Sequence, residues 1–208
     1  YAKLPYDPIR DFAPITRLTS YKTVLVVHPS VPARNLTEFI ALAKANPGTL
    51  TFGSFGQGSG GHLNMEALKA HLGLDIVHVP YKGSAPVMVD LVAGRLSTVL
   101  ISVSSSANPV KAGKLRALAY AGSRRSQILP DVPTFAEAGV ADFENTSWFC
   151  LMAPAGTPRP ILGRIQEEVA RITRDAAFNQ QWLAGRGLDA VGDTPEQLAE
   201  IIRAELPY

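Results

Sequence analysis

The feature that most constrains the fold is a regular alternation of strand-like and helix-like segments between residues 24 and 120. Short apolar runs, several of them rich in β-branched residues, predict buried strands over 24–27, 50–52, 76–79, 96–101 and 115–120. Apolar residues at helical spacing predict helices over 36–43, 63–72 and 84–94, each stopped by a glycine-containing turn. Ser84 is expected to cap the third helix, with Pro86 in its first turn. This alternation predicts an α/β fold with a mostly parallel sheet covered by helices.

The composition changes near Trp148, after which the chain is expected to be mainly helical. A turn-rich connector over 153–160 leads into amphipathic helices around 161–172, 178–183 and 195–206. Thr157 is expected to cap the first of these helices, with Pro158 at its first position. Thr194 and Gln197 have the spacing of a capping box for the last one.

Composition and charge exclude several classes of function. A net charge of +2 gives no basic field of the kind that nucleic-acid binders use, so we expect no nucleic-acid partner. No apolar run is long enough to insert into a membrane. The single cysteine, Cys150, has no partner for a disulfide, and the four histidines lack metal-ligand spacing. We therefore expect no metal site.

The glycine-rich segment from Gly53 to His62 lies between a predicted strand and a predicted helix. Glycines let backbone amides turn toward a ligand, and a helix N-terminus adds unpaired donors and a partial positive charge. Together they favour an anion site for a carboxylate or a phosphate. Ser54, Ser59 and His62 add polar side chains to this loop.

Three other interpretations of this loop remain open at this point. A plain tight turn is one. A dinucleotide site is the second: Gly56, Gly58 and Gly61 satisfy G-x-G-x-x-G, and Lys82 suits the 2′-phosphate of NADP, although the following strand does not end in an acid. The third is a hydrolase with a serine nucleophile, but neither loop serine fits Gly-x-Ser-x-Gly.

Several longer motifs occur along the chain. They are Tyr6–Pro14, Gly53–Ser59 with His62 and Leu63, His78–Gly83, Lys111–Leu118, Leu129–Thr134 and Ala153–Pro158. In this order, and over nearly the whole chain, these motifs resemble one known family, the receptors of tripartite tricarboxylate transporters, also called the Bug family.

The resemblance implies a type II periplasmic-binding-protein fold, in which two α/β lobes close on a ligand at a hinge. By analogy, residues 1–29 and 148–208 belong to lobe one and residues 30–147 form lobe two. Members usually carry a Pro-Phe-x-x-Gly-Gly loop that this chain lacks, so we expect lobe one to be incomplete here. The implied function is a periplasmic receptor that passes a small carboxylate to the membrane permease subunits of its transporter. No enzymatic activity and no cofactor are implied.

The family pattern is carried over to this chain residue by residue. The implied ligand-binding positions are Ser54, Gly56, Gly58, Ser59, His62, Tyr81, Lys82, Gly83, Ser102 and Trp148. Because parallel strands present ligands at their carboxyl ends, the loops at 54–62 and 81–83 and Ser102 are expected to converge. Many members have an acid or amide near position 101 or 102, where this chain has Ile101 and Ser102. That departure favours an acid without an amino group.

Overall fold

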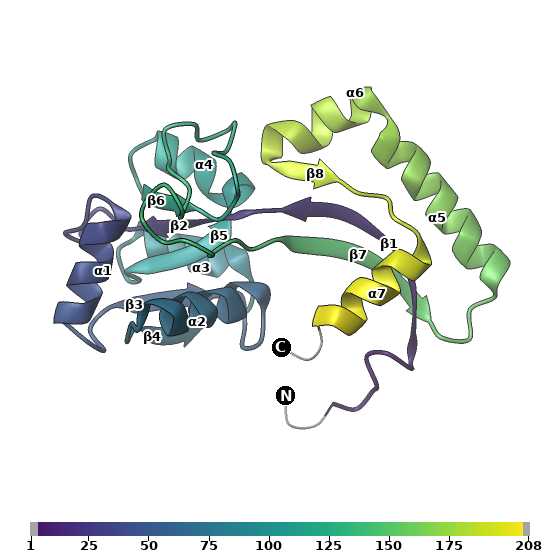
Figure 1. Ribbon diagram of the computed structural model, residues 1–208, viewed down its shortest axis with the longest axis horizontal. Coiled ribbons are helices and arrows are strands. Elements are labelled where there is room, and N and C mark those ends of the chain that lie inside the picture. The colour runs from purple at the N-terminus through teal and green to yellow at the C-terminus, as the bar shows by residue number, and fades with distance from the viewer. Residues whose placement is uncertain (1–3, 206–208) are drawn as a thin grey trace. The chain divides into compact units, whose positions relative to one another are not determined.

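The computed structural model describes residues 4–205 and divides into two compact units (Figure 1). Unit 1 comprises Tyr1–Tyr21 and Trp148–Tyr208, and unit 2 comprises Lys22–Ser147. Both units combine helices with a sheet, so the predicted α/β class is confirmed. None of the helices within residues 4–205 is both long and apolar enough to cross a bilayer.

Unit 2 is built on a five-stranded sheet with the strand order β4-β3-β5-β2-β6. Its strands are β2 (Thr23–Val27), β3 (Thr51–Ser54), β4 (Val77–Pro80), β5 (Thr98–Ser102) and β6 (Arg116–Tyr120). β3 pairs in parallel with β4 and β5, whereas β2 runs antiparallel to both β5 and β6. The predicted strands are therefore present, and all of them except β2 run in one direction.

Helices cover both faces of this sheet. Alternate residues of the central strands point to opposite sides, and both sets are apolar, so each face has to be covered. Leu25 and Leu100 pack in a cluster with Phe39 of α1 (Leu36–Ala45) and Leu68 of α2 (Gly60–Leu72). Val24 and Val99 pack on the other side, in a cluster with α3 (Ser84–Val92) and α4 (Val103–Lys111). β2 is buried along its whole length.

The start of α3 and the existence of α4 differ from expectation. Gly83, with φ +116°, is the N-cap of α3, so the prediction that Ser84 caps this helix is wrong. Ser84 is already the first helical residue. α4 was missed because Ser104, Ser105 and Pro109 are weak helix formers. Pro109 is accommodated within this helix near its end.

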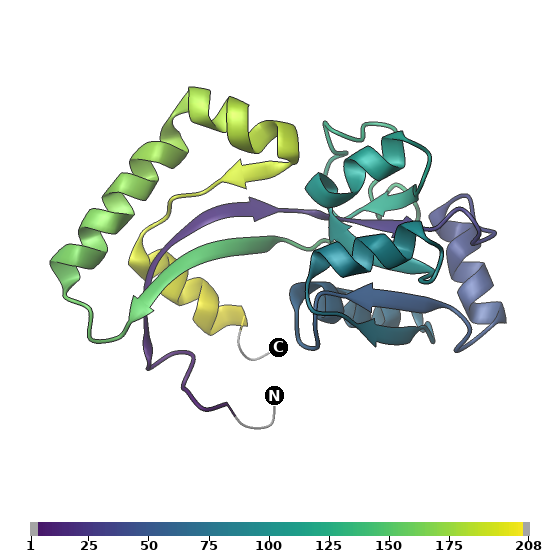
Figure 2. The ribbon, with the colours of Figure 1, turned by 180° about the vertical axis from the view of Figure 1, so that it is seen from behind.

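Unit 1 contains a three-stranded sheet with the order β7-β1-β8, and β7 lies beside β1 in both views (Figures 1 and 2). Its strands are β1 (Phe12–Tyr21), β7 (Ser147–Pro154) and β8 (Leu188–Ala190), none of which was predicted. Its helices are α5 (Arg159–Arg174), α6 (Ala176–Phe178) and α7 (Pro195–Glu205). A π-helical turn (Asn179–Leu183) and a 3₁₀ turn (Ala184–Arg186) follow α6.

The caps of the unit 1 helices can be compared with expectation. The capping box of α7 is confirmed, since the Gln197 amide donates to Thr194 Oγ1 and the Thr194 amide donates to Gln197 Oε1. α5 starts one residue later than predicted, with Pro158 rather than Thr157 at its N-cap. In both helices a proline or capping residue fixes the start.

The boundary between the units falls earlier than the predicted one after residue 29. Residues 22–29 cluster with unit 2, because β2 is hydrogen-bonded between β5 and β6. The second boundary lies between Ser147 and Trp148. The identity of the two units with the two lobes of a receptor stays a prediction.

Candidate functional site

Three strands of unit 2 end at the same edge of the sheet, and three helices begin there. We call this the carboxyl edge, defined by Ser54, Pro80 and Ser102 as the last residues of β3, β4 and β5. The chain continues from these ends into α2, α3 and α4. Two backbone hydrogen bonds tie the first two connections together, from Tyr81 N to Ser54 O (3.0 Å) and from Gly83 N to Phe55 O (3.1 Å). The predicted convergence of loops 54–62 and 81–83 is therefore present.

The electrostatics of the carboxyl edge favour an anion. Each helix start carries backbone amides without intrahelical acceptors and a partial positive charge. None of α2, α3 and α4 has an acidic residue in its first turn, and none has a side chain that caps its first amides. Lys82, an exposed cation, lies in the connection before α3.

Ser54 and Ser59 both hold the glycine loop through their hydroxyl groups. Ser54 is fully buried, and its Oγ lies 2.7 Å from His78 Nε2 and 3.0 Å from the Gly56 carbonyl oxygen. The Gly56 amide donates back to this hydroxyl at 3.3 Å. Ser59 Oγ donates to the same carbonyl oxygen at 2.7 Å. The serine hydroxyls of the loop are thus engaged within the protein.

His62 also acts within the loop. Its Nδ1 accepts the Gly58 amide at 3.0 Å, which places the ring proton on Nε2. Its ring stacks on that of His78 with centroids 3.9 Å apart, and His78 stacks in turn on Phe52 at 4.7 Å. Burial and the neighbouring His62 lower the pKa of His78 below its ordinary value. The sequence gives no sign of the pairing between His78 and Ser54, because these residues lie 24 positions apart.

The amides that remain for a ligand belong to the start of α2. Three other amides of the loop already have acceptors. The Gly56 amide donates to Ser54 Oγ, the Gly58 amide to His62 Nδ1, and the His62 amide to the Ser59 carbonyl oxygen. Within residues 4–205, the amides of Gly60 and Gly61 have no assigned acceptor. Gly60 is exposed, whereas a Cβ at the buried Gly61 would lie 2.9 Å from the Phe55 ring. The backbone of Gly60 is therefore open to solvent, whereas Gly61 packs closely against the Phe55 ring.

The side chain of Tyr81 is bonded to α3. Its hydroxyl donates to Asp90 Oδ2 of α3 at 2.7 Å, and burial together with this bond raises the pKa of Tyr81 to about 12. Asp90 also pairs with Arg95. The Tyr81 side chain is thus engaged within the protein, and Tyr81, Lys82 and Gly83 form the connection from β4 to α3.

The last two predicted site residues, Ser102 and Trp148, lie in different units. Ser102 Oγ lies 2.9 Å from Ser104 Oγ and 3.0 Å from Ser105 Oγ, forming a cluster of hydroxyls at the start of α4. The run of serines was visible in the sequence, but its placement depended on α4. Trp148 belongs to unit 1, where its indole Nε1 donates to Glu205 at 3.2 Å.

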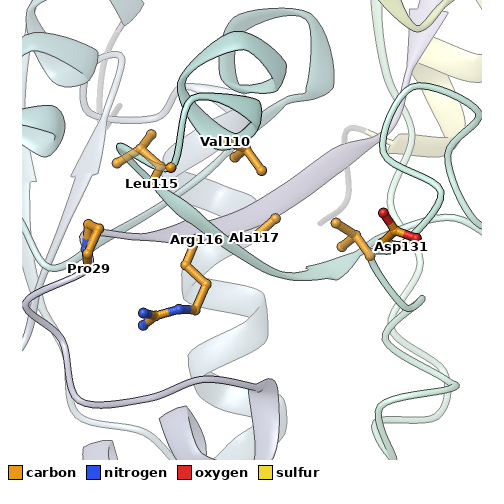
Figure 3. Close-up of a pocket in the computed structure, with 8 residues that line it drawn as sticks. Pro29, Val110, Leu115, Arg116, Ala117 and Asp131 are labelled. Carbon is orange, nitrogen blue, oxygen red and sulfur yellow. The ribbon is translucent and has the colours of Figure 1, made fainter.

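A hollow of about 400 Å³ lies beside β6 in unit 2 (Figure 3). Arg116 and Asp131 are among its lining residues, and the Arg116 guanidinium points away from Asp131. That guanidinium donates to the Ala33 carbonyl oxygen at 2.8 Å, so its charge is already solvated by backbone. No group of three or more metal-ligating side chains gathers anywhere within residues 4–205. The carboxyl edge remains the better candidate for binding a small anion.

Related sequences identify the family of this chain. Residues 1–207 match the family described as "Tripartite tricarboxylate transporter family receptor". A UPF0065 protein in the tcbD-tcbE intergenic region of Pseudomonas sp. is 37% identical over 99% of the chain, and Protein BugT of Bordetella pertussis is 33% identical over 98%. The chain covers 61% and 62% of these two proteins, so it spans about three fifths of their length.

Solved structures resemble the fold closely. A protein of R. palustris with adipate has a TM-score of 0.94 at 34% identity, covering 100% of this chain and 69% of that one. MatC of Rhodopseudomonas palustris with bound malate has a TM-score of 0.91 at 29% identity, covering 99% and 70%. These neighbours confirm the type II periplasmic-binding-protein class. The chain belongs to the receptor family of the tripartite tricarboxylate transporters.

Proposed function

We propose that this chain is part of a periplasmic receptor that binds a small organic carboxylate at the carboxyl edge of unit 2. The single observation that carries the proposal is the meeting of three uncapped helix starts without acidic residues in their first turns. Relatives solved with adipate and with malate support a carboxylate as the ligand. The receptor would deliver this ligand to the membrane permease subunits of a tripartite tricarboxylate transporter.

Binding at this edge relies on neutral donors. One carboxylate oxygen accepts the amides of Gly60 and Gly61, and the start of α3 offers the amides of Ser84 and Ala85. Each charge-assisted hydrogen bond contributes about 1.5–3 kcal/mol, which is enough for useful affinity from a few contacts. Dipoles of this kind hold an anion without activating it, and Ser54, whose hydroxyl lies 2.7 Å from His78 Nε2, is fully buried and therefore out of reach of a substrate. Reversible capture is therefore the proposed activity, not catalysis.

We propose further that the two units are the lobes of the receptor and that the hinge lies where the chain passes between them. The crossings are at Tyr21–Lys22 and Ser147–Trp148. A ligand favours closure only to the extent that it binds the closed state more tightly than the open one. Trp148, which follows one crossing directly, is the predicted contact from lobe one.

The NADP alternative is weaker on this geometry. In a dinucleotide site the glycine amides face the pyrophosphate. Here the Gly58 amide is bonded to His62 Nδ1 and the Gly56 amide to Ser54 Oγ. The two amides that a pyrophosphate would need as hydrogen-bond donors are therefore already bonded within the protein.

Calorimetric titration of the protein at its full genomic length tests the proposed function. Adipate and malate are expected to bind, whereas NADP and the uncharged diamide of adipate are not. Binding of NADP alone, or equal binding of the diamide, contradicts the proposal.

A variant at the helix start locates the site. Gly60→Pro removes one amide where proline is tolerated, because Gly60 is the first helical residue and Ser59 before it is extended. Gly60→Ala is the matched control that keeps the amide. Loss of one such bond predicts about tenfold weaker adipate binding for the proline variant, with the alanine variant close to wild type. Equal affinities of the two variants would place the ligand elsewhere.

A further inference from the structure

The glycine loop is held at two points by a stack of aromatic rings. Phe52 of β3, His78 of β4 and His62 of α2 lie face to face, with centroids 4.7 Å and 3.9 Å apart along the stack. His62 Nδ1 accepts the Gly58 amide at 3.0 Å, and His78 Nε2 lies 2.7 Å from Ser54 Oγ. Two imidazoles thus help to hold the loop, His62 directly at Gly58 and His78 through Ser54, and their rings stack on each other.

The position of each proton follows from these bonds. His62 must carry its proton on Nε2, which lies 4.0 Å from Glu66 Oε1, because Nδ1 accepts from Gly58. The Ser54 hydroxyl has one proton, which it can donate either to His78 Nε2 or to the Gly56 carbonyl oxygen. Its oxygen accepts the hydrogen bond of the Gly56 amide. A neutral His62 is thus required by the loop conformation seen here.

The charged side chains that face the two imidazoles are Glu66 and Lys69, both of α2. Lys69 Nζ binds Glu66 at 2.8 Å and 3.0 Å and lies 5.2 Å from the centre of the Phe52 ring. The carboxylate beside the stack is therefore already paired with a cation. Burial and the proximity of His62 also lower the pKa of His78, so the second ring resists a charge.

We propose that His62 is a positioning residue for the anion site, and that protonation of His62 releases the loop and weakens carboxylate binding. This inference rests on the proposed function. Once His62 carries a second proton, Nδ1–H faces Gly58 N–H and two donors oppose each other. Gly58, at φ +77°, then loses the contact that holds it two residues before the open amide of Gly60. The receptor is thereby sensitive to mild acid.

The decisive variant is His62→Asn in the protein at its full genomic length. The asparagine Oδ1 can occupy the place of Nδ1 and accept the Gly58 amide, yet it takes up no proton in this range. His71→Asn is the matched control, since His71 lies exposed near the other end of α2. All proteins meet the same ionisation of the probe, adipate, so differences between them report on the protein.

Adipate affinity is measured at pH 7.5 and pH 5.5. Wild type and His71→Asn are expected to lose about tenfold more affinity than His62→Asn over this range, since a proton that must leave before binding costs up to tenfold per pH unit. His78→Gln, which keeps a hydrogen-bonding atom near Ser54, should retain the wild-type fall because His62 is intact. The same fall in wild type and His62→Asn overturns the proposal.

A ligand-free measurement separates this proposal from the proposed function. The imidazole nitrogens of His62 and the Gly58 amide proton are followed by NMR from pH 7.5 to pH 5.5. The Gly58 resonance is expected to move upfield along the same titration curve as His62. If Gly58 stays fixed while His62 takes up its proton, the positioning role is refuted even where adipate binds. If neither adipate nor malate binds at pH 7.5, the proposed function fails and so does the link to binding.

Discussion

Unit 2 has a dense core on both faces of its sheet, whereas unit 1 has a thin one. The two clusters of unit 2 bury large side chains completely, such as Phe39, Phe52 and Leu100. In unit 1, Ile15, Ala170, Leu183 and Leu198 are the buried apolar residues within the described part of the chain. α5 buries only Ala170 and Thr173, and its other apolar side chains stay partly or largely exposed.

The exposed residues of α5 show what the difference means. Ile161, Ile165 and Ile172 are 51%, 37% and 39% exposed on a helix that is strongly amphipathic in sequence. An apolar stripe of this kind normally packs on a partner. Unit 2 therefore has within itself the burial that a stable domain needs, and it is also the unit that carries the carboxyl edge. Unit 1 leaves part of its apolar surface without a cover in the described residues.

The largest expected effect compares one aliphatic truncation in each unit. Leu100→Ala removes a fully buried side chain of β5 and should lower the free energy of unfolding of unit 2 by about 3 kcal/mol. Ile165→Ala in α5 should change the free energy of unfolding of unit 1 by less than about 1 kcal/mol, because the side chain is partly exposed. Urea unfolding followed by circular dichroism measures both. Equal losses would show that α5 is packed in solution.

A partly buried ion pair links two segments of unit 1. Asp193 accepts from Arg17 Nε at 2.6 Å and from the Arg17 amide at 2.6 Å, joining β1 to the segment before α7. Asp193→Ala leaves these donors without an acceptor and should destabilise unit 1 by about 2 kcal/mol. Both tryptophans, Trp148 and Trp182, lie in unit 1, so their fluorescence reports this loss selectively. An unchanged fluorescence transition would contradict the assignment.

The smallest effect concerns pH. All four histidines lie in unit 2, and the pKa of His78 is lowered in the folded state from the ordinary value of 6.5. The unfolded chain therefore binds a proton more readily, so the stability of unit 2 falls as the pH drops below about 6.5 and levels off once folded His78 is protonated. His78→Gln should flatten this dependence. Thermal unfolding at pH 7.5 and pH 5.5 measures this pH dependence. A steeper loss of stability in His78→Gln than in wild type would contradict the expected contribution of His78.

The strands and helices of unit 2 were predictable because their signals are local. Runs such as Val24–Val27 and the glycine after Leu72 mark buried strands and helix ends within a few residues. β1 and β8 were not predicted, since β1 mixes apolar and polar residues and β8 has three residues that depend on pairing with β1. Tertiary pairing decides such strands, and a single sequence does not display it.

The site was predictable in place but not in detail. Strand–helix order located the carboxyl edge, and the glycines located the open amides near Gly60. The roles of Ser54, His62 and Tyr81 were assigned to the ligand, whereas the structure engages each of these side chains with His78, Gly58 and Asp90. Each of these contacts except His62–Gly58 joins different elements, so sequence spacing gave no sign of them.

The most direct test of a carboxylate site at the carboxyl edge is an amide NMR titration of the protein with adipate. The account predicts that the largest shifts fall on Gly60 and Gly61, with smaller ones at the start of α3. Unit 1 offers an alternative groove of about 690 Å³ between α5 and α7, lined by Leu162, Ala199 and Arg203. Shifts that gather on that groove, with Gly60 and Gly61 unmoved, would contradict the account.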